Sequence, residues 1–421
     1  MLALKIGLCR SSFPNSFILK STVCQNGKFS SLNQTTFSPK YKLFQKPVSV
    51  NKSNFLIRQQ ITTVAAKKPI NSDVKVGRWL IMCAGMVGGA ITLGGYTRLT
   101  ESGLSMVNWH FTFESAPQTE QDWINEFNKY KEFPEFKQLK SDLTLEQFKS
   151  IWTTEFIHRS WGRCIGIFFL IPAVSYMMKG YFNPALKKRV FVFGALIAAQ
   201  GLLGWYMVKS GLENRFSEPT DIPRVSQYRL AAHLGLALTL YTGLMWTALD
   251  LLMPTQTISK ALPHLKKLKI LANSCKGMVF LTALSGAFVA GLDAGLVYNS
   301  FPKMSDKWIP DDIFSLSPMY KNFFENPTTV QFNHRILGIS TFTLAVVTSI
   351  LTRWYTLPQK CRRAGTVLGV AACLQVSLGI ATLLHHVPVG EALAHQTGSV
   401  LLLTTAIWLA QSLKKIKYVP K

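Results

Sequence analysis

The chain has 421 residues, and its 46 Lys and Arg against 21 Asp and Glu give a formal net charge of +25, yet 48% of its residues are hydrophobic and only 16% are charged. A nucleic-acid-binding protein with this excess should be rich in charge, with basic stripes on soluble domains. Length alone would allow about three soluble domains. The apolar residues occur in long runs, however, and this argues against soluble domains and indicates positive charge around membrane segments.

The N-terminal segment is basic and free of acidic residues. Residues 1–72 contain eleven Lys and Arg, no Asp or Glu, and many Ser, Thr, Asn and Gln. This composition is typical of an organelle transit peptide, and the compact apolar core of a secretory signal is missing. The alternative is a basic disordered tail. We expect a mitochondrial transit peptide over residues 1–70, cleaved at an undetermined point, which leaves a charge of +14 on the residues after 72.

The seven cysteines form no Cys-x-x-Cys pair, and two of them lie in the expected transit peptide. This spacing predicts neither a disulfide framework nor a zinc site. We expect them to be inert core or loop residues: Cys9, Cys24, Cys83, Cys164, Cys275, Cys361 and Cys373.

Eight apolar segments predict an all-α integral membrane protein. A hydrocarbon core about 30 Å thick needs roughly 20 mostly apolar residues per helix. Gly and Ala runs within the segments suit close helix packing in lipid, either within one chain or between copies, so a homo-oligomer stays open. The weakest span is the fifth, which contains Asp293 and many small residues. The predicted spans are 77–96, 157–178, 190–208, 230–252, 277–297, 335–352, 364–384 and 392–411.

The connecting loops predict the orientation of these spans. The loops 179–189, 254–276 and 353–363 and the tail 412–421 carry seventeen Lys and Arg and no acidic residue, whereas the opposite loops carry thirteen basic and seventeen acidic residues. Under the positive-inside rule the basic loops and both termini share one compartment. If the transit peptide is mitochondrial, this compartment is the matrix. We therefore expect a protein of the mitochondrial inner membrane whose C-terminal tail, 412–421, lies in the matrix.

The longest opposite loop, 97–154, is predicted to contain short amphipathic helices near the membrane surface. Trp123, Phe127 and Tyr130 recur at helical spacing before Pro134, and a second apolar series begins at Leu145. We expect a lid or packing element rather than a separate domain.

The second half of the chain repeats motifs of the first. Two four-span repeats, 77–252 and 277–411, have the same orientation because four is an even number, so we predict two parallel four-helix bundles related by a pseudo-twofold axis along the membrane normal. The matching segments are 155–159 (EFIHR) with 331–335 (QFNHR), 229–235 (RLAAHLG) with 391–398 (EALAHQTG), and 89–94 (GAITLG) with 286–291 (GAFVAG).

Four histidines lie in the first residues of the even-numbered spans, on the face opposite the basic loops: His158, His233, His334 and His395. A single histidine there is usually a packed or solvated interfacial residue, but ionisable groups at one depth in both repeats indicate a functional site. Zinc would need more protein ligands, and a di-iron site would need several Glu. Two imidazoles from facing helices suit the axial positions of a heme iron in a four-helix bundle, so we predict one heme site per repeat.

The repeats differ at one position of the histidine motif. Glu155 lies three residues before His158 on one helical face, and the matching residue in the second repeat is Gln331. A partly buried carboxyl group could support proton-coupled chemistry at the first site, whereas the second site would hold a permanent electron-handling cofactor. The alternative is that Glu155 only caps the helix or pairs with Arg159.

These motifs, together with 97–105 (TRLTESGLS) after the first span, resemble the heme A synthase family and its mitochondrial branch in particular. The resemblance covers residues 75–411. It implies that His334 and His395 ligate a prosthetic heme B, that His158 and His233 bind the substrate heme O, and that Glu155 is the essential glutamate. It further implies two successive hydroxylations of the C8 methyl of heme O through heme I, then dehydration to the formyl group of heme A.

The resemblance also implies partners. Heme A would serve cytochrome c oxidase assembly, electrons would come from a matrix ferredoxin and its reductase, and heme O synthase and oxidase assembly factors are candidate partners beside membrane lipid. No nucleic acid is expected. Some bacterial members carry a cysteine pair in the first external loop, but residues 97–154 contain no cysteine, so a mechanism that requires this pair cannot operate here.

Other polar residues are weaker candidates. Arg98, Arg159, Arg163 and Arg335 are candidate partners of heme propionates, with interfacial anchoring as the alternative, and Asp293 is either a packing contact or part of a proton path. Histidines without a repeat partner are expected to be solvated loop residues: His110, His264, His385 and His386.

Two other functions remain open at this point. A di-heme electron carrier would hold two permanent hemes and tolerate Glu155→Gln, and a heme chaperone would hold and deliver heme unchanged. The Glu155 and Gln331 difference favours the enzyme.

Overall fold

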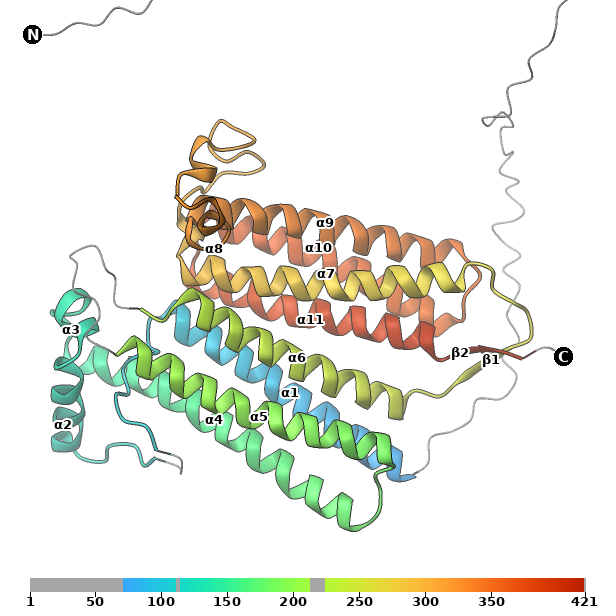
Figure 1. The fold of residues 1–421 in the computed structure, drawn as a ribbon, viewed down its shortest axis with the longest axis horizontal. Coiled ribbons are helices and arrows are strands. Elements are labelled where there is room, and N and C mark those ends of the chain that lie inside the picture. Colours follow the sequence, from blue (N-terminus) through green and yellow to red (C-terminus); the bar gives the residue numbers. More distant parts are fainter. Residues whose placement is uncertain (1–70, 111–113, 213–223, 420–421) are drawn as a thin grey trace, which may run out of the picture. The chain divides into compact units, whose positions relative to one another are not determined.

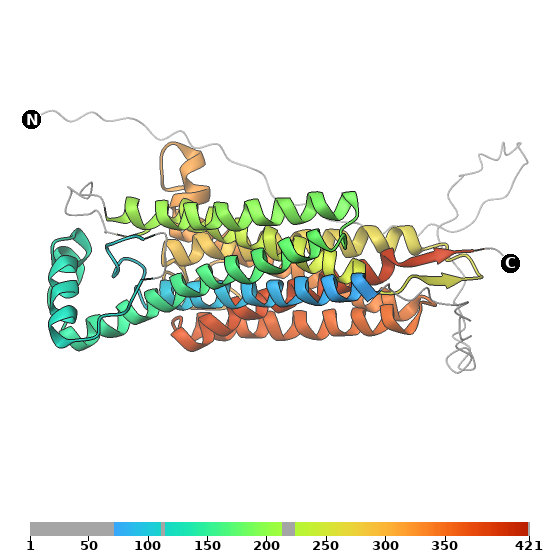
Figure 2. The ribbon, with the colours of Figure 1, turned by 90° about the horizontal axis from the view of Figure 1, so that it is seen from below.

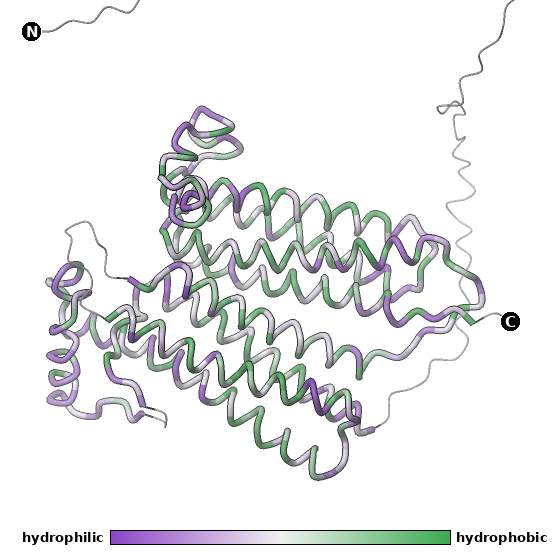
Figure 3. Tube along the Cα trace, in the orientation of Figure 1, coloured by the Kyte–Doolittle hydropathy of each residue, from purple (hydrophilic) through white to green (hydrophobic). Residues whose placement is uncertain are grey.

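The computed structural model describes residues 71–110, 114–212 and 224–419, and the expected transit peptide at 1–70 lies outside the described residues. Eight helices in the described part are long and apolar enough to cross a membrane, which confirms the predicted all-α membrane fold. Figure 3 shows their apolar middle parts and more hydrophilic ends. The eight are α1 (Asn71–Leu99), α4 (Leu145–Met178), α5 (Pro184–Gly211), α6 (Gln227–Leu252), α7 (Leu265–Gly291), α9 (Pro327–Trp354), α10 (Gln359–Leu384) and α11 (Val389–Lys414).

The long helices pack in the same way in each half of the chain (Figure 1). In the first half α1 packs on α4 and α6, and α5 packs on α4 and α6; in the second half α7 packs on α9 and α11, and α10 packs on α9 and α11. The halves meet where α6 contacts α7 and α11, and where α1 contacts α11. If the two halves are exchanged, the contact of α6 with α7 corresponds to that of α11 with α1, and the contact of α6 with α11 corresponds to itself. This is the pattern expected for two bundles of the same orientation.

Side-chain caps fix where several of these helices begin. The Thr144 hydroxyl accepts from the backbone N–H of Gln147, whose side chain accepts from the backbone N–H of Thr144, so that α4 begins with a capping box. Asn326 caps α9 through the backbone N–H groups of Thr328 and Thr329, and Pro327 occupies the first helical position, where its missing N–H does no harm.

Two helices differ from the sequence prediction. The apolar series that begins at Leu145 does not form a separate surface helix. It is the start of α4, which runs for 34 residues to Met178, because no residue between this series and the predicted second span interrupts the helical pattern. The fifth span ends at Gly291, six residues earlier than predicted. Asp293 follows in the left-handed conformation (φ 51°), which no continuing α-helix can contain, so this residue lies beyond the helix.

The external loop between α1 and α4 contains the predicted amphipathic helix, α2 (Glu120–Lys131), and the short α3 (Pro134–Leu139). Their apolar faces pack with the start of α4 in a small cluster of Met106, Phe127, Tyr130, Phe148 and Trp152. Tyr130 donates to the carboxylate of Glu135 (2.8 Å), and burial raises the pKa of Glu135 against the opposing effect of Lys140. Both views show α2 at the end of the bundle opposite β1 and β2 (Figures 1 and 2).

The corresponding connection of the second half consists of short elements at the same end of the bundle as α2 (Figure 2). They are the 3-10 helices η2 (Ala294–Leu296), η3 (Asp311–Phe314) and η4 (Met319–Lys321) and the α-helix α8 (Asn322–Glu325). Asn322 and Asn326 fasten them through side-chain bonds to the carbonyl oxygens of Leu316 and Asp312.

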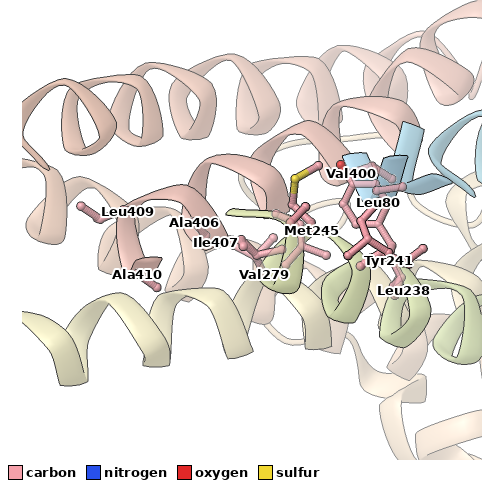
Figure 4. Packing of buried hydrophobic residues seen from close by; sticks show 14 of the residues in the cluster. Leu80, Leu238, Tyr241, Met245, Val279, Val400, Ala406, Ile407, Leu409 and Ala410 are labelled. Carbon is pink, nitrogen blue, oxygen red and sulfur yellow. The ribbon is translucent and has the colours of Figure 1, made fainter. Parts of the chain in front are cut away.

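The main hydrophobic core includes the surface where the two halves meet. Figure 4 shows Leu80, Leu238, Tyr241, Met245, Val279, Val400 and Ile407 packed between helices of both halves. The Tyr241 hydroxyl also bonds to Thr404 across this surface (2.6 Å). Complete burial of such side chains stabilises the contact between halves.

The opposite end of the bundle carries a two-stranded parallel sheet that the sequence did not predict. Strand β1 (Gln256–Ile258), in the connection between the halves, pairs with β2 (Ile416–Tyr418) in the C-terminal tail. Beside it, Asp250 forms ion pairs with Lys414 (3.2 Å) and Lys415 (3.1 Å), so the tail is fixed to the first half.

We predict that Phe148→Ala loosens the external cluster without unfolding the bundle. Phe148 is fully buried and stacks on Phe127 at 4.8 Å between ring centres. Removing such a ring costs about 3–5 kcal/mol, confined here to a small cluster. Limited proteolysis of the purified protein should show faster cleavage within 114–140. The control, Ile124→Ala, removes an exposed apolar side chain of α2 and should leave the cleavage rate unchanged; equal rates in both variants would contradict the prediction.

Candidate functional site

The four predicted histidines lie in the N-terminal halves of α4, α6, α9 and α11. His233, His334 and His395 lie within the first eight residues of their helices, but His158 is the 14th residue of α4, because this helix begins in the external loop at Leu145. The structure brings His334 of α9 and His395 of α11 together, with ring centres 6.5 Å apart and ring planes at 83°. An imidazole nitrogen binds a transition metal at about 2 Å. A metal ion bound between the two rings would therefore be compatible with ring centres at this separation. In the first half, His158 and His233 come from α4 and α6, which occupy the places of α9 and α11 in the packing of the second half.

Each histidine ring is placed against a glycine of a neighbouring helix. A β-carbon built on each glycine would lie between 2.6 and 3.5 Å from the Cε1 atom of the ring, so three of the four contacts are tight or overlapping and none leaves free space. The pairs are Gly94 with His158, Gly204 with His233, Gly286 with His334, and Gly379 with His395. The same contact thus recurs twice in each half and positions all four imidazoles.

These contacts correct one detail of the predicted repeat. The sequence comparison aligned segment 89–94 with 286–291, but the structure puts Gly286, not Gly291, in the position of Gly94 against the histidine ring. The same shift aligns Glu101 (φ 49°) with Asp293 (φ 51°), two non-glycine residues in the left-handed conformation. The letters favour the register that pairs both glycines of each segment, and only the contacts with the histidine rings show that the other register is the structural one.

Two glutamines that the sequence did not single out bond from α5 to α6 and from α10 to α11. Gln200 donates to the backbone carbonyl of His233 (3.1 Å), and Gln375 donates to that of His395 (2.9 Å) and lies 3.2 Å from its Nδ1. A polar residue at matching positions of two apolar spans was the available signal.

The ring nitrogens of the two halves have different surroundings. Ser285 lies 2.6 Å from Nδ1 of His334, whereas Nδ1 of His158 and Nδ1 of His233 are buried with no hydrogen-bond partner in the described part of the chain.

Glu155 is buried at 2% exposure and holds the segment after α1 in place. Its carboxylate accepts from the Ser105 hydroxyl (2.7 Å), the Met106 backbone N–H (2.8 Å) and the Arg159 guanidinium (2.5 Å). The pairing with Arg159, considered from the sequence as an alternative role, is therefore present.

Gln331 performs the same fastening in the second half without a charge. Its amide donates to the carbonyl oxygens of Ala294 (2.8 Å) and Tyr298 (3.1 Å), and it accepts from Arg335 (3.1 Å). Arg335 then binds the carbonyl of Ser300 (2.9 Å), as Arg159 binds that of Asn108 (2.8 Å). Fastening the loop does not by itself require a carboxylate at this position.

All four arginines predicted as propionate partners already have protein partners. Arg98 pairs with Asp293 (2.7 Å), and Arg224 pairs with the same carboxylate (3.1 Å), so Asp293 joins segments of both halves. Arg163 donates to the carbonyl of His110 (2.9 Å) and to Glu114 (3.3 Å). Three arginines still have a buried nitrogen without a partner among the described residues: Nε of Arg159, Nη1 of Arg163 and Nε of Arg335.

The remaining histidines lie as predicted, and Cys83, Cys275 and Cys361 are buried as predicted, but Cys164 and Cys373 are exposed on α4 and α10 and so belong to neither core nor loop. His110, His264, His385 and His386 are exposed, and His385 pairs with Glu391 (2.8 Å). The five cysteines in the described ranges are free, and Cys9 and Cys24 lie outside them.

The donor set fits a heme iron better than a metal ion held by protein alone. No group of three or more His, Cys, Asp or Glu side chains suited to a metal occurs within the described ranges. Two imidazoles per half would be too few to hold a metal ion by themselves, but would suffice for a heme, whose porphyrin supplies the other ligands of the iron. Buried arginine nitrogens without partners, near histidines on the same helices, are donors that suit the carboxylates of such a ring.

The fold and the site together define an eight-span membrane protein with one histidine pair in each four-helix half. Residues 77–407 match the family described as cytochrome oxidase assembly protein, COX15-CtaA. The chain is 54% identical over 342 residues to heme A synthase COX15 of Bos taurus, covering 81% of this chain and 82% of the relative, and 54% identical to the Homo sapiens protein, covering 81% and 83%.

A third relative, the heme A synthase-mitochondrial ferredoxin fusion protein of Schizosaccharomyces pombe, is 36% identical over 423 residues, which cover 91% of this chain and 68% of the relative. The chain therefore belongs to the COX15-CtaA family of cytochrome oxidase assembly proteins.

We predict that Gly379→Ala displaces the His395 ring and lowers the heme content of the purified protein. The added β-carbon would lie 2.6 Å from Cε1, too close for the ring to keep its place. Disturbing the groups that orient a metal-binding histidine typically weakens metal affinity about 10–100-fold. The absorbance of bound heme per protein measures the effect. Gly338→Ala on α9, where a β-carbon meets nothing within 4 Å, is the control; full heme content in Gly379→Ala would refute the prediction.

Proposed function

We propose that this protein is a heme A synthase, which oxidises the C8 methyl group of heme O to the formyl group of heme A. The reaction proceeds by two successive hydroxylations through heme I, followed by dehydration, and its product serves cytochrome c oxidase assembly. The observation that carries the proposal is the paired architecture: two histidine pairs in equivalent glycine contacts, with a carboxylate beside only one of them. The relatives named heme A synthase support the same activity.

The substrate heme O binds in the first repeat, 77–252, between His158 and His233. A substrate must enter and leave, and the absence of a hydrogen-bond partner on either Nδ1, within the residues that the structure describes, suits a site whose ligands bind heme only transiently.

A prosthetic heme B would be held in the second repeat, 277–411, by His334 and His395. Their separation of 6.5 Å between ring centres and the contact between Ser285 and Nδ1 of His334 support this assignment. When bound, the heme supplies electron transfer. The pseudo-twofold axis that would relate the two repeats is part of this proposal.

Glu155 is the proposed catalytic residue, and it holds or moves a proton at its carboxylate. Gln331 fastens the equivalent loop in the second half with a neutral amide, so the charge at Glu155 has a purpose beyond fastening. Arg159 and Ser105 are bonded to the carboxylate and keep it in one orientation beside the substrate site. The free buried nitrogens of Arg159, Arg163 and Arg335 are candidate donors to heme propionates.

The protein is placed in the mitochondrial inner membrane with both termini in the matrix and the histidines toward the intermembrane space. The loop charges support this orientation through the positive-inside rule. The relative fused to a mitochondrial ferredoxin supports a matrix ferredoxin, with its reductase, as the electron source. Heme O synthase and oxidase assembly factors are further proposed partners.

We expect Glu155→Gln and His158→Ala to abolish heme A production in cells. The first change removes the charge that distinguishes the two halves, and the second removes a ligand of the substrate. Heme O or heme I should accumulate, as measured by chromatography of extracted hemes. Glu101→Gln, at an exposed first-half carboxylate, is the control. Normal heme A in a strain with no other source would refute the enzyme and favour an electron carrier or a heme chaperone.

His334→Ala and His395→Ala should strip the purified protein of tightly bound heme B, because each removes one axial ligand. His158→Ala should retain it. Heme B per protein, measured after extraction, tests the assignment of the two halves. A full complement of heme B in both second-half variants would void this assignment.

A further inference from the structure

A column of three hydroxyl groups lies behind His334 in the second half. The Ser285 Oγ is 2.6 Å from Nδ1 of His334 and 2.8 Å from the backbone carbonyl of Thr282. The side-chain hydroxyl of Thr282, a different group from this carbonyl, bonds to the Thr341 hydroxyl (2.7 Å), so that residue Thr282 links the two contacts. These residues join α7 to α9 behind the imidazole.

The hydroxyl group of Ser285 has only one hydrogen, and the carbonyl of Thr282 can only accept. Both contacts of Ser285 are hydrogen bonds at the same time only when this hydrogen goes to the carbonyl and the oxygen accepts from the imidazole of His334. Nδ1 therefore carries the proton, and Nε2 has its lone pair free for a metal. A bond of this kind also orients the ring and makes it a stronger ligand.

The first half has no such column. The register set by Gly94 with Gly286 and by His158 with His334 makes Leu93 the counterpart of Ser285 and Ala90 the counterpart of Thr282. By the same register Ile165, a buried side chain, stands in the place of Thr341. None of these side chains can bond to an imidazole, in agreement with the partnerless Nδ1 of His158.

We propose that Ser285 is a positioning residue that makes the second-half heme site permanent, and that Leu93 leaves the first-half site free to exchange its heme. This inference rests on the proposed function, because it assigns a resident heme to one half and a heme substrate to the other. Ser285 acts through His334 alone, without contacting the reacting group.

The test is the rate at which heme leaves the purified, heme-loaded protein in detergent for an excess of apomyoglobin. In Ser285→Ala the rate of heme B loss should rise about tenfold, the usual effect of removing an outer partner of a metal-binding histidine. The reduction midpoint potential of the heme should shift upward, because the weaker imidazole stabilises the ferric iron less. Ser285→Thr keeps the hydroxyl and should restore both values.

Thr343→Ala is the matched control, because it removes a hydroxyl that bonds only to the backbone carbonyl of Ile339 on an exposed face of α9. If the substitutions only weaken the bundle, heme loss should rise equally in Thr343→Ala and Ser285→Ala, and the midpoint potential should not change. This result would overturn the proposal. Unchanged loss rate and potential in Ser285→Ala would overturn it too. Both results leave the proposed function standing, since that function fails only if Glu155→Gln and His158→Ala still make heme A.

Discussion

The contact between a histidine ring and a glycine of the next helix is the constraint on which the site depends. It occurs at α1 with α4, at α5 with α6, at α7 with α9 and at α10 with α11. An alanine in place of Gly94 or Gly379 would bring its β-carbon within 3.1 Å of the ring, so the imidazole would have to move or the helices to separate. Helix spacing and ligand position are thereby set together, and the same contact in both halves gives two sites of one design.

On this common frame the two halves carry different polar groups. The second half surrounds its histidines with neutral donors and acceptors, the Gln331 amide and the Ser285 hydroxyl among them, which hold loop and ligand without a charge. The first half has a carboxylate in the place of the amide and an apolar side chain in the place of the hydroxyl. Under the proposed function, this difference in polar groups would let one half retain a heme and the other convert one, on the same arrangement of helices.

The two halves are joined by different contacts at the two ends of the bundle. At the site end, Arg98 and Arg224 meet at Asp293 and join the two halves beside the loops. At the other end, β1 and β2 join the connection between the halves to the C-terminal tail. Both contacts link segments far apart in sequence, and together they hold the two bundles at either end of the apolar surface between them.

The sequence by itself determined the eight spans, the four histidines and the single carboxylate that distinguishes the halves. A long apolar run or a repeated motif can be recognised from the residues of one segment alone. It did not determine that α4 continues from the external loop, that Gly286 rather than Gly291 matches Gly94, or that Ser285 faces His334. Those features depend on the relative rotation and height of neighbouring helices. Packing across the bundle sets these quantities, and no local pattern in one helix contains them.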